Sequence, residues 1–167
     1  RSAKTISFFD FSTLYTNIPH ENLLQVLIRI IEFVFKGNTR EKISISLSGE
    51  ANWVTKVRKG TFFFTMPSLI KAVECLINNC YFTVGKILLK QIIGIPMGLD
   101  PAPYFANLFL FHYESEWFKK TKKTNNMLAR KFGKTFRFID DLININDGGE
   151  FERIWTEIYP SELQLKK

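Results

Sequence analysis

Three aspartates interrupt apolar stretches of this sequence at two places far apart along the chain. Asp10 ends the apolar stretch at residues 6–9, and Asp140 and Asp141 separate residues 136–139 from residues 142–145. An ionised carboxylate beside apolar strands is costly to desolvate unless it is paired or binds a cation. Mg²⁺ is held in proteins by one or two carboxylates together with substrate phosphates. The three acids therefore point to metal-dependent phosphoryl transfer.

Asp140 and Asp141 occupy the middle of an expected β-hairpin. Residues 135–139 and 142–146 are short runs rich in branched and aromatic side chains, separated by two residues, which is the hairpin pattern. Successive strand residues point to opposite faces, so both carboxylates reach one metal only at a tight turn. Two acids break the usual Asn-Gly or Asp-Gly preference of such a turn, as is expected at a functional site. A solvated acidic turn stays open as the alternative, since exposed aspartates are ordinary.

A glycine-rich segment lies between the two acidic sites. Gly94 and Gly98 flank a short apolar stretch, and glycine lets another chain or a ligand approach the backbone closely. Asp100 and Pro101 have the residue types of a helix N-cap and a first helical position. Residues 102–111 are apolar nearly all round, so a buried helix is expected there. Considered alone, the segment is better explained as a plain strand-to-helix connection.

Taken together and in this order, the three segments resemble reverse transcriptases. The segment from Asp10 to Tyr15 resembles their first metal-binding motif, Gly94-Ile95-Pro96-Met97-Gly98 their substrate-positioning motif, and Phe138-Ile139-Asp140-Asp141 their aromatic-x-Asp-Asp box. Residues 9–20 and 158–163 are similar to the retroelement branch that includes Penelope-like elements, which is akin to telomerase. Phe138 stands where many members have tyrosine, and Met97 where retroviral relatives have glutamine.

The resemblance implies an RNA-directed DNA polymerase that adds deoxynucleotides to a primer 3′-hydroxyl with the help of two Mg²⁺ or Mn²⁺ ions. Asp10 and Asp140 would bind the metals, Asp141 would assist, and the main-chain carbonyl of Phe11 would complete one coordination shell. Tyr15 falls at the position of the family's sugar-discriminating aromatic, although a core tyrosine is the ordinary explanation of such a residue. The residues implied to line the incoming nucleotide are Tyr15, Gln91, Gly94, Pro96, Met97 and Gly98.

The expected fold class is α+β, a palm-type polymerase domain with an antiparallel sheet backed by helices. Residues 1–167 are expected to form one reverse transcriptase domain, a fragment of fingers and palm in which the fingers are incomplete and the thumb is missing. The patterning predicts strands at residues 4–11, 81–84, 87–91, 135–139 and 142–146, short strands and loops between 43 and 65, and helices at 19–37, 67–79, after 100 and at 150–159.

The composition agrees with a nucleic-acid partner. The net charge is +7 and the pI about 9.4, which favours acidic partners such as nucleic acid, although a membrane surface would be served equally well. No apolar run approaches the roughly 20 residues that span a bilayer. Cys75 and Cys80 are too few for a disulfide framework or a zinc site.

The densest positive stretch is expected either to contact phosphates or simply to complement a helix C-terminus. It comprises Lys119, Lys120, Lys122 and Lys123, followed by Arg130, Lys131, Lys134 and Arg137, and the first four are the residues expected to bind nucleic acid. The partners implied are an RNA template, a DNA primer and dNTPs, with no membrane, and the protein is expected inside the cell, in the nucleus if the source is a eukaryote. The oligomeric state is left open.

Two alternative functions stay open. The first is an inactive or domesticated fragment that binds nucleic acid, against which the retention of all three costly acids argues. The second is an RNA-directed RNA polymerase, against which Tyr15 argues, because a bulky aromatic beside the sugar disfavours ribonucleotides.

Overall fold

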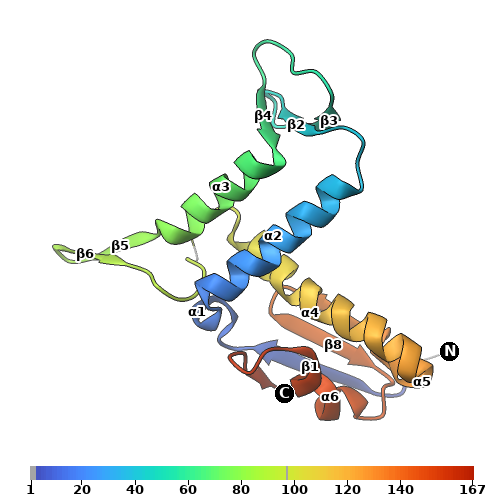
Figure 1. The fold of residues 1–167 in the computed structure, drawn as a ribbon. Coiled ribbons are helices and arrows are strands. Elements are labelled where there is room, and N and C mark those ends of the chain that lie inside the picture. Colours follow the sequence, from blue (N-terminus) through green and yellow to red (C-terminus); the bar gives the residue numbers. More distant parts are fainter. Residues whose placement is uncertain (1–2, 97) are drawn as a thin grey trace. The chain divides into compact units, whose positions relative to one another are not determined.

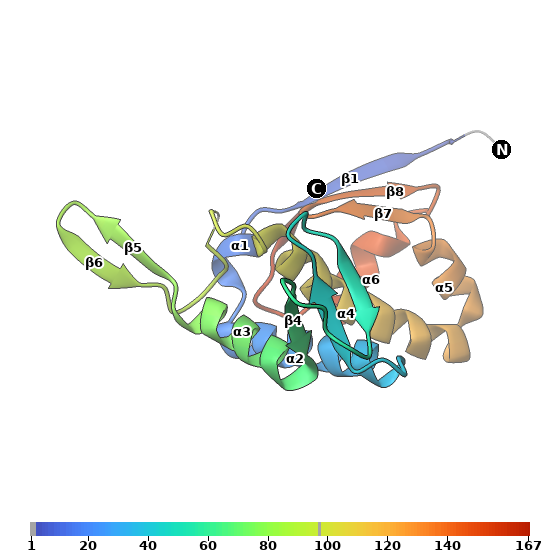
Figure 2. The ribbon, with the colours of Figure 1, turned by 90° about the horizontal axis from the view of Figure 1, so that it is seen from above.

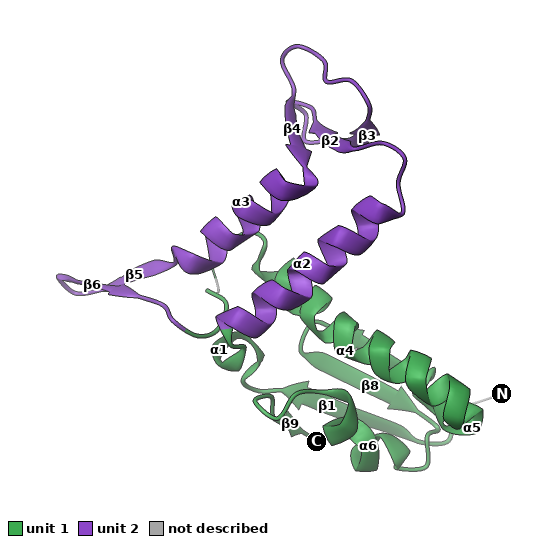
Figure 3. Ribbon diagram, viewed as in Figure 1, with its two compact units in different colours: residues 1–19, 93–167 green, residues 20–92 purple. Residues whose placement is uncertain are grey.

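The computed structural model describes residues 3–96 and 98–167, and the chain divides into two compact units (Figure 3). Unit 1 comprises Arg1–Pro19 and Ile93–Lys167, and unit 2 comprises His20–Ile92. Met97 lies outside the described residues.

A four-stranded antiparallel sheet forms the centre of unit 1 (Figure 1). Its strand order is β7-β8-β1-β9, so the strand nearest the N-terminus pairs on both sides with strands from the C-terminal part of the chain. The strands are β1 (Ile6–Phe11), β7 (Thr135–Phe138), β8 (Asp141–Ile145) and β9 (Leu165–Lys166). The expected α+β class with antiparallel sheets is confirmed.

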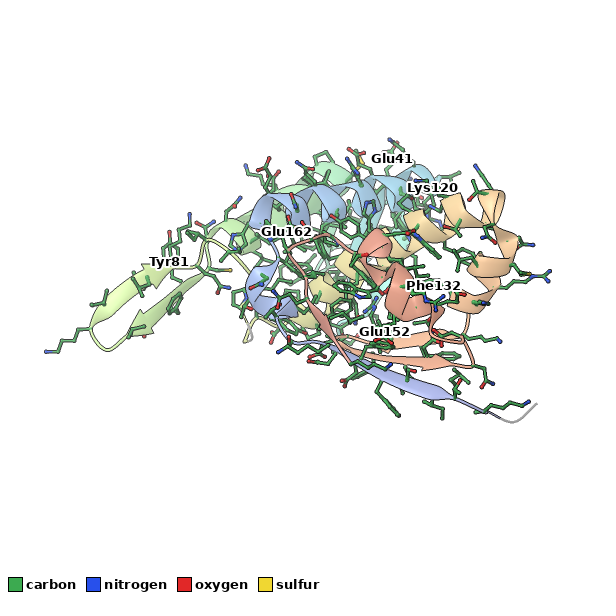
Figure 4. The ribbon with its side chains drawn as sticks, turned by 90° about the horizontal axis from the view of Figure 1, so that it is seen from below. Glu41, Tyr81, Lys120, Phe132, Glu152 and Glu162 are labelled. Carbon is green, nitrogen blue, oxygen red and sulfur yellow. The ribbon has the colours of Figure 1, made fainter. Side chains whose placement is uncertain are left out.

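Helices cover one face of this sheet. Figure 2 shows α4 (Ala102–Thr124), α5 (Asn126–Phe132) and α6 (Glu150–Ile158) on the same side of β1, β8 and β7. The buried Phe9 of β1 contacts Phe151 of α6, with ring centroids 5.1 Å apart. Phe132, which Figure 4 labels among these helices, packs between Trp117 and Phe151. Alternation in the strands therefore buries one set of aromatic side chains in a core shared by sheet and helices.

The opposite face of the sheet carries exposed apolar side chains in the described part of the chain. Phe8 of β1 is 64% exposed, and Phe136 and Phe138 of β7 are 60% and 75% exposed. In β8, Ile143 alternates with the buried Leu142 and lies opposite Phe8 and Phe136. Asp10 and Asp141 belong to this open face.

Unit 2 contains two long helices, a small sheet and a hairpin. Its helices are α2 (His20–Lys36) and α3 (Met66–Asn78), and the sheet has the order β3-β2-β4. Thr65 caps α3 in a capping box with Ser68, and a proline follows at the start of that helix. The strands are β2 (Lys42–Ile45), β3 (Ala51–Val54), β4 (Phe62–Thr65), β5 (Tyr81–Val84) and β6 (Ile87–Lys90).

The structure corrects the predicted elements in three places. The hairpin turn consists of Ile139 and Asp140, not of the two aspartates, so Asp141 is the first residue of β8 and pairs with Phe138. The helix after the glycine-rich segment begins at Ala102, with Pro101 and not Asp100 at the cap position. Two short helices were not predicted, α1 (Leu14–Asn17) and α5, because segments of four and seven residues are too short for a clear helical period.

Candidate functional site

Asp10 and Asp141 lie directly opposite each other on neighbouring strands. The antiparallel pairing of β1 with β8 aligns Asp10 with Asp141 and Phe9 with Leu142. Opposed residues of an antiparallel pair point to the same face with their Cβ atoms about 4.5–5.5 Å apart. The fold thus brings two of the three predicted acids together from distant parts of the sequence.

Asp140 joins the same arrangement through the backbone of the turn. The amide of Phe11 donates a hydrogen bond to the carbonyl of Asp140 at 3.1 Å, so the end of β1 is tied to the residue that begins the acidic pair. Ile139, the first residue of this turn, has a φ of +57°, which is unusual for a β-branched side chain. A strained conformation of this kind persists only where the surrounding structure holds it.

The opposed pair fits a divalent cation. Like charges directly opposite in a sheet repel each other, and in the described residues the ion pairs involve other carboxylates and leave Asp10, Asp140 and Asp141 out. Within residues 3–96 and 98–167, no group of three or more His, Cys, Asp or Glu side chains is arranged to hold a metal. A pair of carboxylates suffices for Mg²⁺, because substrate phosphates and waters provide the remaining ligands.

Tyr15 lies within the electrostatic reach of Asp140. Burial, and then the negative charge of Asp140, raises the pKa of Tyr15 above its usual value of 10.0. The tyrosine therefore stays neutral at physiological pH, which suits a residue that contacts a substrate through its ring and hydroxyl. This places the predicted sugar-selecting residue in the same part of unit 1 as the predicted metal ligands.

The glycine-rich segment is locked onto the backbone around Tyr15. The amide of Gly94 donates to the carbonyl of Ile18 at 2.8 Å, and the amide of Ile95 donates to the carbonyl of Tyr15 at 2.6 Å. Gly94 has a φ of +81°, and a Cβ there would meet the carbonyl oxygen of Tyr15 and the backbone of Thr16. The close approach expected at Gly94 is therefore made by the chain itself.

A pocket of about 440 Å³ opens beside Tyr15. Gly98, Leu99 and Asp100 line it from the glycine-rich segment, and Ala102 and Pro103 line it from the start of α4. A Cβ on Gly98 would have no heavy atom within 4 Å, so the backbone at Gly98 is open to a ligand. The volume lies in the range of about 300–1,000 Å³ that is typical of small-molecule sites.

Two predicted nucleotide-binding residues lie outside the described residues of unit 1. Gln91 belongs to unit 2, where its amide donates to the carbonyl of Cys80 at 2.9 Å. Met97 falls outside the described residues. Pro96, half-buried, follows the anchored Ile95 in unit 1.

The four lysines lie at the C-terminal end of α4, and all are exposed. Lys119 pairs with Glu116 at 3.1 Å on the helix surface, and Lys122 and Lys123 occupy the last turn, where cations complement the helix dipole. Lys120, labelled in Figure 4, borders a second pocket of about 420 Å³ together with Trp117 and Glu157. The arrangement is compatible with both explanations of the lysines.

Sequence reasoning did not identify two groups of residues that adjoin the acids. Lys166 of β9 lies opposite Asp10 on the side away from Asp141. No local sequence pattern predicts this pairing, because a two-residue strand is too short to show a period. Arg137, which the sequence placed in the basic stretch, is 10% exposed in its side chain and pairs with Glu114 at 2.6 Å. Its position two residues before the acidic turn was the only available signal.

Comparison with solved structures shows the same architecture in telomerase. Apo telomerase from Candida tropicalis matches 96% of this chain with a TM-score of 0.60 and 13% identity, over 27% of its own length. The telomerase of Candida albicans, in complex with the TWJ fragment of telomeric RNA, matches 96% of this chain and 26% of its own length, with a TM-score of 0.58 and 15% identity. The chain has a telomerase-like fold.

The Candida tropicalis telomerase bound to the same kind of RNA fragment gives a TM-score of 0.60 at 14% identity, over 96% of this chain and 24% of that one. The chain thus spans about a quarter of the length of these telomerases. No protein-family model and no curated protein matches the sequence. At this identity the likeness concerns the fold alone. In the described ranges no helix is both long and apolar enough to span a bilayer.

Proposed function

We propose that this protein is an RNA-directed DNA polymerase and that Asp10, Asp140 and Asp141 form its catalytic centre. The observation that carries the proposal is the direct opposition of Asp10 and Asp141 across β1 and β8, with Asp140 bonded through its carbonyl to Phe11. Two opposed carboxylates on the uncovered face of a sheet repel each other, and a divalent cation bound between them would relieve that repulsion. The telomerase-like fold supports the choice of a templated polymerase among metal-dependent phosphoryl-transfer enzymes.

The cofactor proposed is Mg²⁺, with Mn²⁺ as a substitute, held by the carboxylates of Asp10, Asp140 and Asp141 and by the main-chain carbonyl of Phe11. When bound, a pair of such ions supplies activation of the primer 3′-hydroxyl and neutralisation of charge on the triphosphate. The chain's own contribution is positioning, since β1 and β8 fix the acids on a rigid sheet. The anchored segment from Gly94 to Gly98 and the pocket beside Tyr15 would hold the nucleotide.

The proposed substrates are dNTPs, and the proposed partners are an RNA template and a DNA primer. Tyr15 lines the pocket at the start of α4, where its ring would collide with a ribose 2′-hydroxyl. Gln91, Met97 and the lysines of α4 are proposed contacts to the nucleotide and the nucleic acid. Telomerases of this fold have been solved with the TWJ fragment of telomeric RNA, which supports RNA as a partner. We place the protein in a Penelope-like retroelement, with a nuclear location in a eukaryotic host.

Primer extension tests the proposal. The 167-residue chain and a longer polypeptide that contains it are each assayed on an RNA template with a DNA primer, dNTPs and Mg²⁺. We expect extension by the longer protein, weak extension by the chain alone, and none with Asp10→Asn or Asp140→Asn. Glu152→Gln is the matched control, because Glu152 bonds Lys167 at 2.6 Å on the surface of unit 1.

Each rival function gives its own result in this assay. Nucleic-acid binding without extension by the longer protein would identify a non-catalytic binding protein. Preference for ribonucleotides would identify an RNA-directed RNA polymerase. Extension by Asp10→Asn at the wild-type rate would refute the assignment of the acids.

A further inference from the structure

Arg137 makes a bidentate ion pair inside unit 1. Its Nε donates to Oε1 of Glu114 at 2.6 Å, and its Nη2 donates to Oε2 of the same carboxylate at 3.1 Å. The two side chains are only 10% and 17% exposed. A fork of this kind fixes the plane and direction of a guanidinium, which a lysine ammonium cannot reproduce.

The rest of the guanidinium reaches the acidic turn. Nη1 donates to Oδ1 of Asn107 at 2.6 Å and to the carbonyl of Ile139 at 3.1 Å. Ile139 is the residue with the strained φ of +57°, and it directly precedes Asp140. Arg137 therefore binds the carbonyl of the one turn residue whose conformation needs to be held.

The contacts of Glu114 also extend to β1, the strand that contains Asp10. The hydroxyl of Tyr159 donates to Oε1 of Glu114 at 2.8 Å, and the ring of Tyr159 packs against Phe11 edge to face with centroids 4.8 Å apart. Phe11 in turn donates its amide to the carbonyl of Asp140. The ring of contacts joins β1, α4, β7 and the segment after α6 around the turn that carries the acids.

We propose that Arg137, held in place by Glu114, is the positioning residue of this site. Its hydrogen bond keeps the backbone of Ile139 in the left-handed region and thereby sets Asp140 and Asp141 opposite the end of β1. The expected effect on metal affinity rests on the proposed function, whereas the expected effect on the structure of the turn rests on the geometry alone. Arg137 is consequently not a phosphate-binding member of the basic stretch, since its donors face Glu114, Asn107 and Ile139.

The test compares Arg137→Lys and Glu114→Gln with a matched control. Glu150→Gln also removes the charge of an ion-paired glutamate in unit 1, but that pair, with Lys131 at 3.1 Å, does not touch the turn. The first readout is hydrogen exchange at the Phe11 amide, which reports its bond to Asp140 directly. The second is the dissociation constant for Mn²⁺, measured on the folded chain by electron paramagnetic resonance.

We expect faster exchange at Phe11 in both test variants and wild-type exchange in Glu150→Gln. Replacing residues that orient metal ligands typically weakens metal affinity by about 10- to 100-fold, and Arg137→Lys should fall in that range. The double variant Arg137→Lys/Ile139→Gly should recover part of the loss, because glycine adopts a positive φ without the help of the guanidinium. If the role of Arg137 were purely structural, Arg137→Lys would lower the melting temperature of the chain and leave its Mn²⁺ affinity unchanged at temperatures where it is folded.

Wild-type exchange at Phe11 in both test variants would overturn the proposal. If Arg137→Lys does not fold, Glu114→Gln and the milder Tyr159→Phe, which keeps the ring against Phe11, decide the same question. If the wild-type chain binds no Mn²⁺, the proposed function fails, while the exchange rates still decide whether Arg137 positions the turn.

Discussion

Replacing Gly94 by alanine should damage the fold around the site more than any other glycine substitution in unit 1 whose surroundings are described. A Cβ at Gly94 would lie 3.0 Å from both the Cα and the carbonyl oxygen of Thr16, and closer still to the carbonyl oxygen of Tyr15. All three are backbone atoms, so no side chain can rotate away. The residue is also buried, with a φ of +81°.

Two costs add up at this position. A residue with a Cβ in the left-handed region costs about 1–2 kcal/mol, and overpacking a tight site costs about 1–3 kcal/mol. The expected loss is therefore about 2–5 kcal/mol, against a total stability of about 5–15 kcal/mol for a typical domain. Because the bonds from Gly94 and Ile95 anchor the segment to Ile18 and Tyr15, nucleotide binding should weaken together with stability.

Urea unfolding followed by circular dichroism measures this loss of stability. Substitutions at two other glycines of unit 1 separate the backbone conformational cost from the packing cost. Gly149 has a φ of +79° with nothing within 4 Å, so Gly149→Ala should show the conformational cost alone. Gly133 has a φ of −61° and only ordinary contacts, so Gly133→Ala should be nearly neutral. A loss at Gly94 no larger than that at Gly149 would show that the packing against Tyr15 is not tight and would refute the reasoning.

Three further predictions concern charge and substrate choice. Asp141→Asn should stabilise the metal-free chain by about 0.2–1 kcal/mol, because it removes the repulsion from Asp10 and keeps Lys166 opposite the charged Asp10, and added Mg²⁺ should raise the melting temperature of the wild type but not of this variant. Tyr15→Val should lower the ratio of kcat/KM for deoxyribonucleotides over ribonucleotides, and an unchanged ratio would make Tyr15 a packing residue. Burial, followed by the charge of Glu114, raises the pKa of Tyr159 well above 10.0. The unfolded chain thus loses this proton first, so stability should be full below about pH 10 and fall as the pH rises toward the folded-state pKa, a fall that Tyr159→Phe should reduce in alkaline unfolding curves.

The sequence alone determined the elements with a strong local signal. The apolar stretch before Asp10 and the paired runs around the aspartates predicted β1, β7 and β8, and the helical spacing after Pro19 predicted α2. Pro67 marked the start of α3 to within one residue, and the capping box at Thr65 was found only in the structure. Such signals are read locally because backbone geometry repeats every 2 or about 3.6 residues. The glycine at residue 94 was likewise recognised as a point of close approach, but not the atoms that approach it.

Only the tertiary structure decided which residues meet. It moved the turn by one residue, so that Asp141 and not Asp140 lies opposite Asp10. The carbonyl of Ile139 in this turn accepts a hydrogen bond from Arg137, two residues earlier, and Arg137 pairs with Glu114, which is 23 residues away in the sequence. The tertiary structure also brought Lys166 beside Asp10 and left the side chain of Arg137, an apparent surface cation in the sequence, only 10% exposed. Strand register and ion-pair partners arise from contacts between distant segments, and no local period of the sequence encodes them.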